Sequence, residues 1–91
     1  MVIIQAPIFE RAVKKLFANQ KAILDKEILK IAKNPKSGQV KVGDLAGIQV
    51  VKFKIQKVEY LLAYRILSKS KIRLLLLAPH ENFYRDLKKR L

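Results

Sequence analysis

The sequence predicts an α+β domain in which helices pack on a mostly antiparallel, four-stranded sheet. Three observations lead to this prediction. The 91 residues are enough for one modest core and too few for a second domain. Two stretches in the first third of the chain carry apolar residues at helical spacing. From residue 49 onward the apolar residues follow the period of strands, so the expected order of elements is β-α-α-β-β-β-α.

A strand and a helical hairpin are predicted for the N-terminal part. Val2–Gln5 is a short β-branched run that stops before Pro7. Proline suits the first turn of a helix, and apolar residues recur at helical spacing over residues 7–17. After a break at residues 18–20, a second helical pattern runs to Asn34–Pro35, because the residue before proline avoids the α region. Two amphipathic helices joined this closely predict a hairpin that covers one face of the sheet.

The next strands follow a loop, residues 36–47, which contains all three glycines. Apolar and polar residues alternate over residues 49–56, so this strand has one apolar face. A turn at Lys57–Val58 leads to a strand over residues 59–67. A polar connection, Ser68–Lys71, predicts a hairpin to the last strand.

The C-terminal part combines the most apolar strand with a short helix. Ile72–Ala78 is apolar almost throughout, apart from Arg73, which predicts a central strand covered on both faces. Phe83, Leu87 and Leu91 recur four residues apart. This spacing predicts a helix from Glu81 to the end of the chain with a single apolar stripe.

The charge is the unusual part of the composition. Twenty Lys and Arg residues stand against seven Asp and Glu, which gives a net charge of +13. The excess is spread along the chain rather than confined to a tail. A folded domain with this field attracts polyanions, so we expect nucleic acid, an acidic protein, or both as partners.

The composition also excludes several classes of function. Without cysteine, disulfides and thiolate metal sites are impossible, and with one histidine we expect no metal centre and no cofactor. No apolar run reaches the ~18 residues of a membrane span, and the N-terminus lacks a secretory pattern. We therefore expect a cytoplasmic protein without a membrane partner.

Two basic positions on the predicted strands are candidates for phosphate binding. Lys52 and Lys54 lie two apart on a strand and point to the same face, which suits a phosphodiester backbone. Their alternative role is to keep an exposed strand soluble. Arg65 interrupts an apolar strand and shares its parity with Glu59, so simple antiparallel pairing gathers all four on one face. Alternatively, Arg65 snorkels at the strand end or pairs with Glu59.

Proton-transfer groups follow the last strand. The only histidine, His80, comes directly after Pro79, and histidine exchanges protons near neutral pH more readily than other side chains. Tyr84 lies four residues further on, on the same face of the predicted helix. Both have ordinary alternatives, a solvated histidine and a packing tyrosine. A set of Lys, Arg, Glu, His and Tyr without a metal fits RNA cleavage, because the 2′-hydroxyl supplies the nucleophile.

Five segments of the chain form an ordered set of local patterns: FERAVKKL (Phe9–Leu16), IAKNP (Ile31–Pro35), DLAG (Asp44–Gly47), LLAYRI (Leu61–Ile66) and APHENFYRDLKK (Ala78–Lys89). Taken in this order, they resemble the RelE/ParE superfamily of bacterial and archaeal toxins from toxin–antitoxin pairs. The resemblance covers nearly the whole chain and implies one RelE-like toxin domain over residues 1–91.

The resemblance implies a metal-independent endoribonuclease, an mRNA interferase that cuts mRNA in the ribosomal A site. Lys52 and Lys54 match lysines on the second strand of RelE-type members. His80 and Tyr84 match the YafQ-like branch, which has a histidine and an aromatic residue four apart, and Glu59 lies near that branch's acidic residue.

The same resemblance extends to the remaining cations and to the partners. Several RelE-like enzymes carry an arginine where this chain has Leu61, and Arg65 is the candidate substitute. We expect Lys57 and Arg85 to join in RNA binding. The implied partners are an acidic antitoxin, in a hetero-oligomer, together with mRNA and the ribosome.

Other members of the superfamily keep alternatives open. ParE-type relatives share the fold, poison DNA gyrase and lack this catalytic set. A third possibility is an inactive member that retains only antitoxin binding. Fold alone does not choose among these functions.

Overall fold

The computed structural model describes residues 1–90, with only the backbone of Arg90, and it has the predicted α+β architecture. Leu91, the last residue of the predicted helical stripe, lies outside the described residues. Within residues 1–90, no helix is both long and apolar enough to cross a membrane. In chain order the elements are β1 (Val2–Gln5), α1 (Pro7–Lys14), α2 (Ala18–Lys33), η1 (Pro35–Ser37), β2 (Gln39–Val40), η2 (Gly43–Leu45), β3 (Ile48–Ile55), β4 (Val58–Ser68), β5 (Lys71–Pro79) and α3 (His80–Arg90).

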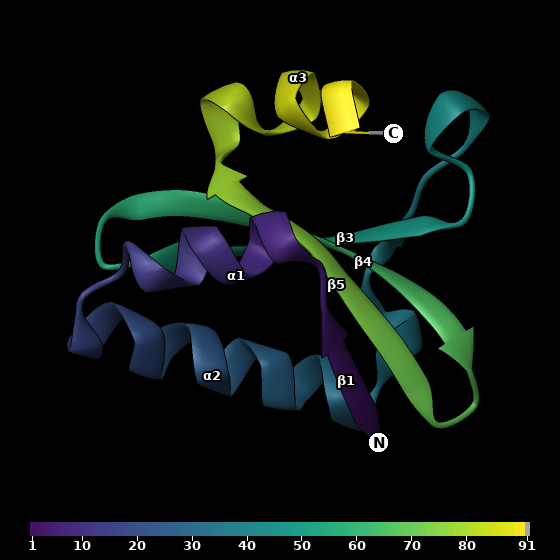
Figure 1. Ribbon diagram of the computed structural model, residues 1–91, viewed down its shortest axis with the longest axis horizontal. Coiled ribbons are helices and arrows are strands. Elements are labelled where there is room, and N and C mark those ends of the chain that lie inside the picture. Colours follow the sequence, from purple (N-terminus) through teal and green to yellow (C-terminus); the bar gives the residue numbers. More distant parts are fainter. Residues whose placement is uncertain (91) are drawn as a thin grey trace.

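The sheet has five strands in the order β1-β5-β4-β3-β2, one more than predicted (Figure 1). All neighbouring strands are antiparallel except β1 and β5. The additional strand, β2, has only two residues, which pair with Val50 and Gln49 of β3. Two residues are too few to show a period in the sequence, so β2 fell within the predicted loop. The predicted central strand, β5, is an internal strand between β1 and β4, and β4 occupies the middle of the sheet.

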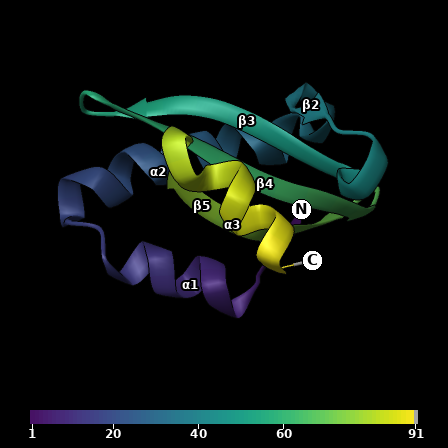
Figure 2. The same cartoon turned by 90° about the horizontal axis from the view of Figure 1, so that it is seen from above.

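Helices cover both faces of the sheet: α1 and α2 lie against one face and α3 against the other (Figures 1 and 2). Strand β4 is the reason for this arrangement, because four consecutive residues are buried and their side chains alternate between faces. One core cluster joins Leu62 and Tyr64 to the helical hairpin through Phe9, Leu24 and Ile31. The other joins Leu61, Ala63 and Ile48 to Phe83 and Leu87 of α3.

Several boundaries differ from the predicted ones, each for a local reason. Helix α1 ends at Lys14 rather than residue 17, and α2 begins at Ala18, so the break between them lies at residues 15–17 rather than 18–20. The backbone N–H of Phe17 donates to the side-chain oxygen of Gln20 at 2.8 Å, which caps α2. The β3–β4 turn is Gln56–Lys57, one residue earlier than predicted, and Gln56 takes a positive φ of 58°.

Tyr64 ties the segment after α2 to the central strand. Its buried hydroxyl donates to the carbonyl of Pro35 at 2.5 Å and accepts from the N–H of Gly38 at 3.0 Å. A Cβ at position 38 would lie 2.6 Å from this hydroxyl, so glycine leaves room for it. Burial raises the pKa of Tyr64, against the opposing effect of the bond from Gly38, and the hydroxyl remains a donor at neutral pH. The tie holds β2 at the edge of β3.

We predict that Tyr64→Phe lowers the free energy of unfolding by about 1–3 kcal/mol, because it leaves the N–H of Gly38 and the carbonyl of Pro35 without their buried partner. Urea denaturation measures the loss. Tyr60→Phe is the matched control, since no hydrogen bond of that hydroxyl occurs among the described residues. Equal losses in the two variants would contradict the role given to Tyr64.

Candidate functional site

The α3 face of β3 carries two exposed lysines at its C-terminal end. Lys54 lies directly opposite Glu59 of β4, and Lys52 lies opposite Leu61. This pairing places Lys52, Lys54, Glu59 and Arg65 on one face of the sheet, although the register differs from the one that a turn at Lys57–Val58 would give. Neither lysine forms an ion pair with a carboxylate among residues 1–89. Both ammonium groups are thus available to an anion that approaches the sheet from outside.

His80 lies beside Glu59. Strands β4 and β5 pair Tyr60 with Pro79, which brings the residues on either side of this pair together. His80 Nδ1 is 4.0 Å from Glu59 Oε1, and the two side chains are 55% and 36% exposed. This separation is too long for a hydrogen bond, so both groups remain available for proton transfer. The end of β5 therefore presents an acid–base pair next to Lys54.

Tyr84 lies one turn along α3 from His80 and is half-buried against the core. Its ring meets the edge of Phe83 at a centroid distance of 5.1 Å. Lys41 Nζ lies 5.0 Å from the ring centroid on the outer side. Tyr84 is therefore a packed residue at the border of the site. Lys41 was missed by the sequence analysis, because its position depends on the unpredicted pairing of β2 with β3.

Arg65 is on the predicted face but away from the other candidates. It lies opposite Ile48 and Arg73, six residues along β4 from Glu59, which is about 20 Å of strand. It forms no ion pair with Glu59. Leu61, four residues away and 2% exposed, lies in the core under α3. Arg65 therefore does not take the place of the family arginine at that position.

The two remaining predicted RNA-binding residues differ in availability. Lys57 is exposed in the β3–β4 turn, close along the chain to Lys54. Arg85 is exposed on α3, but its guanidinium donates to Asn82 Oδ1 at 3.2 Å and lies 3.8 Å from Asp86 Oδ1. Lys57 extends the basic end of the hairpin, whereas Arg85 is engaged within its own helix.

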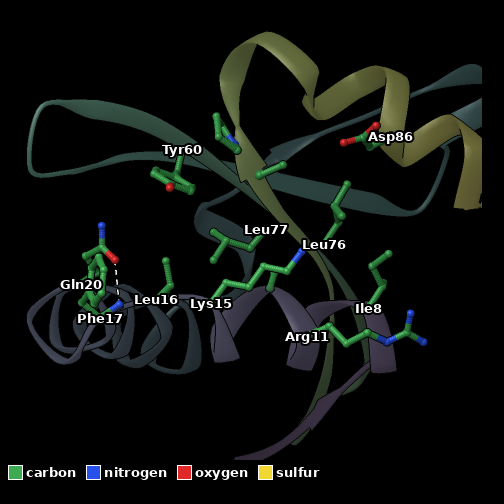
Figure 3. A pocket seen from close by; sticks show the side chains of 13 residues that line it. Ile8, Arg11, Lys15, Leu16, Phe17, Gln20, Tyr60, Leu76, Leu77 and Asp86 are labelled. Atoms are coloured by element: carbon green, nitrogen blue, oxygen red, sulfur yellow. Dashed lines mark hydrogen bonds between the residues drawn. The ribbon is translucent and has the colours of Figure 1, made fainter.

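A groove of about 510 Å³ lies between α1, the end of β5 and α3 (Figure 3). Its apolar wall includes Ile8, Leu16 and Leu77, and it is also lined by Arg11 of α1 and by Lys15, which follows that helix. Phe17 stands at one end and is 74% exposed, which is unusual for a large apolar side chain. None of the predicted catalytic residues lines this groove. The sequence analysis missed it because it forms between elements far apart in the chain.

Comparison with solved structures identifies the fold. The chain is similar to a mutant of the E. coli toxin RelE in the free state, with 16% identity, a TM-score of 0.71 and coverage of 99% of this chain and 97% of that one. It is also similar to the intact E. coli RelBE toxin–antitoxin complex, with 14% identity, a TM-score of 0.67 and coverage of 85% and 93%. The same mutant bound to an antitoxin RelB peptide matches with 17% identity, a TM-score of 0.67 and coverage of 99% and 96%.

These likenesses define the class: an α+β domain with the RelE fold. The family follows from the sequence, because residues 3–88 match the family of ParE-like toxins of type II bacterial toxin–antitoxin systems. The chain belongs to that family, within the RelE/ParE superfamily. No curated protein matches it.

His80 is the first residue of α3, so its position depends on the packing of this helix against the sheet. We predict that Phe83→Ala destabilises the protein strongly, because Phe83 anchors α3 in the core. Phe83 is fully buried, and its truncation should lower the free energy of unfolding by about 3–5 kcal/mol in urea denaturation. Leu67→Ala is the matched control on exposed β4 surface, with an expected loss below about 0.5 kcal/mol. A small effect of Phe83→Ala would mean that α3 is not anchored through this ring.

Proposed function

We propose that this chain is the toxin of a type II toxin–antitoxin pair and that it cuts mRNA on the ribosome without a metal ion. The observation that carries the proposal is the grouping of Lys54, Glu59 and His80 at one edge of the sheet. These groups come from three different strands or helices, and together they supply what RNA cleavage requires. Lys54 would stabilise negative charge, Glu59 would accept a proton and His80 would donate a proton.

In the proposed reaction the 2′-hydroxyl of the RNA attacks the adjacent phosphorus and the bond to the 5′-oxygen breaks. The products are a 2′,3′-cyclic phosphate and a 5′-hydroxyl. Glu59 accepts the proton of the 2′-hydroxyl, and protonated His80 donates a proton to the leaving oxygen. Since Nδ1 faces Glu59, donation falls to Nε2 on the far side of the ring. Lys54 and Lys52 offset the charge that develops on the phosphate, and Tyr84 borders the base.

The partner we propose is an acidic antitoxin with an amphipathic segment in the groove between α1 and α3. Apolar residues of that segment would cover Leu16 and the exposed ring of Phe17. Its carboxylates would meet Arg11 and Lys15 beside the apolar wall. A strongly basic surface favours an acidic occupant over a second copy of the same chain, because two copies repel each other.

The family match favours a second candidate function. In this alternative the chain is a ParE-like toxin without enzymatic activity, which poisons DNA gyrase through its basic surface. An inactive member that retains only antitoxin binding is the third case. Induced expression separates the three, because the first cleaves mRNA, the second causes DNA damage with intact mRNA, and the third does not arrest growth.

We predict that His80→Ala lowers the rate of mRNA cleavage by about 10²–10⁴-fold, because the leaving oxygen loses its proton donor. Lys54→Ala should lower it by about 10²–10³-fold through lost charge stabilisation. Cleavage is measured by mapping mRNA ends within codons on translating ribosomes. Lys26→Ala, on the exposed side of α2, is the matched control and should retain the wild-type rate. Wild-type cleavage by both site variants would refute these roles.

For the antitoxin, we predict that Phe17→Ser weakens binding by roughly 30-fold, the effect of truncating an aromatic residue that is a binding hot spot. The binding partner in the assay is the proposed acidic antitoxin, titrated against the purified toxin by calorimetry. Leu29→Ser is the matched control, because Leu29 is 59% exposed on α2 outside the groove. If both variants bind as tightly as the wild type, the antitoxin does not use this groove.

A further inference from the structure

Two arginines lie directly opposite each other on adjacent strands at the far end of the α3 face. Arg65 of β4 pairs with Arg73 of β5, and directly paired residues of an antiparallel sheet point to the same side. Like charges in this position repel each other and destabilise the sheet. Neither guanidinium forms an ion pair with a carboxylate among residues 1–89. The pair is therefore an uncompensated concentration of positive charge.

The loop before β3 is shaped around one of these arginines. A Cβ at Gly47 would lie 2.6 Å from Arg65 Nη1, and Gly47 has a φ of +85°. Glycine at this position lets the backbone pass next to the guanidinium, which is half-buried, whereas Arg73 is exposed. Partial burial strengthens the interaction of a charge with an approaching anion, because less water screens it. Asp44 of the same loop does not neutralise either arginine.

The pair is separate from the proposed cleavage site. About 20 Å of β4 lies between Arg65 and Glu59, and the α3 core covers the sheet between them. One anion of ordinary size cannot contact both places. A polyanion with one charge on every repeat unit can contact both places at once, and it does not need an apolar contact near Arg65. This describes a polynucleotide strand better than an amphipathic peptide.

We propose that Arg65 and Arg73 bind a phosphodiester group of RNA several nucleotides away from the bond that is cleaved. The proposal rests on the proposed function, since it names a second contact for the same class of substrate. Two planar guanidinium forks side by side suit the oxygens of one phosphate or of two successive phosphates. The phosphate belongs either to the message or to ribosomal RNA.

The test compares Arg65→Gln/Arg73→Gln with the control Lys26→Gln/Lys33→Gln, which removes the same charge from exposed positions of α2. We measure the binding of two RNAs, of 12 and of 4 nucleotides, by fluorescence anisotropy. Both carry a 2′-deoxy nucleotide at the scissile position, so that they cannot be cleaved. The salt concentration is varied from about 50 to about 200 mM, because the salt dependence of the affinity reports the number of phosphate contacts. The arginine variant should lose roughly five- to tenfold affinity for the longer RNA. Its slope of log affinity against log salt should fall by about 1.4, the value for two contacts to a single strand.

Ribosomes without mRNA supply the second arm of the same experiment. If the arginine variant loses affinity only for the 12-nucleotide RNA, the phosphate belongs to the message. If it loses affinity only for ribosomes, the phosphate belongs to ribosomal RNA. Either result supports the proposal, provided that thermal unfolding shows both variants folded. Equal losses in the arginine and lysine variants overturn it, as does a loss confined to antitoxin binding.

The binding assay does not depend on cleavage, so the two proposals fail separately. Wild-type protein that binds RNA through the pair but leaves mRNA intact on ribosomes contradicts the cleavage proposal alone. Wild-type protein that cleaves mRNA, together with an arginine variant indistinguishable from the lysine control, contradicts the second contact alone.

Discussion

The burial of β4 on both faces is the constraint from which the rest of the structure follows. From Leu61 to Tyr64 no side chain is more than 2% exposed, and successive side chains point to opposite faces. Each large apolar side chain removed from water contributes roughly 1.5–3 kcal/mol, so neither face can remain open. The helical hairpin closes one face and α3 closes the other. Because α3 directly continues β5, closing that face also places its first residue, His80, beside Glu59.

This arrangement separates the apolar and the basic parts of the α3 face. The middle of the face lies under Phe83 and Leu87, where a cation would lose its hydration without a partner. Cations are therefore confined to the two ends, with Lys52 and Lys54 at one end and Arg65 with Arg73 at the other. On this face of the sheet, positive charge is thus located at the two ends and not in the middle.

Features with a local or periodic signal were predictable from the sequence. The alternation around Val51 placed Lys52 and Lys54 on one face, and the apolar run of β5 indicated an internal strand covered on both faces. Features that depend on pairing between distant segments were not predictable. Lys41 reaches Tyr84 only because two residues of β2 join β3, and the groove beside Phe17 requires α1 and α3 to lie near the end of β5. Parity alone placed Arg65 and Glu59 on one predicted face, whereas their separation of six residues along β4 corresponds to about 20 Å.

Leu61 shows how these constraints bear on the chemistry of the site. An arginine at this position, as in several RelE-like enzymes, would have to emerge beside α3, whereas Leu61 is packed beneath that helix. Leucine here strengthens the contact that holds α3, and it also removes a cation from the middle of the face. The cations on this side of Leu61 then come from β3 and its turn: Lys52 and Lys54 lie opposite Leu61 and Glu59, and Lys57 follows in the turn. One buried leucine therefore has two effects: it packs against the helix that begins with His80, and it leaves Lys52 on the facing strand as the basic residue directly opposite this position.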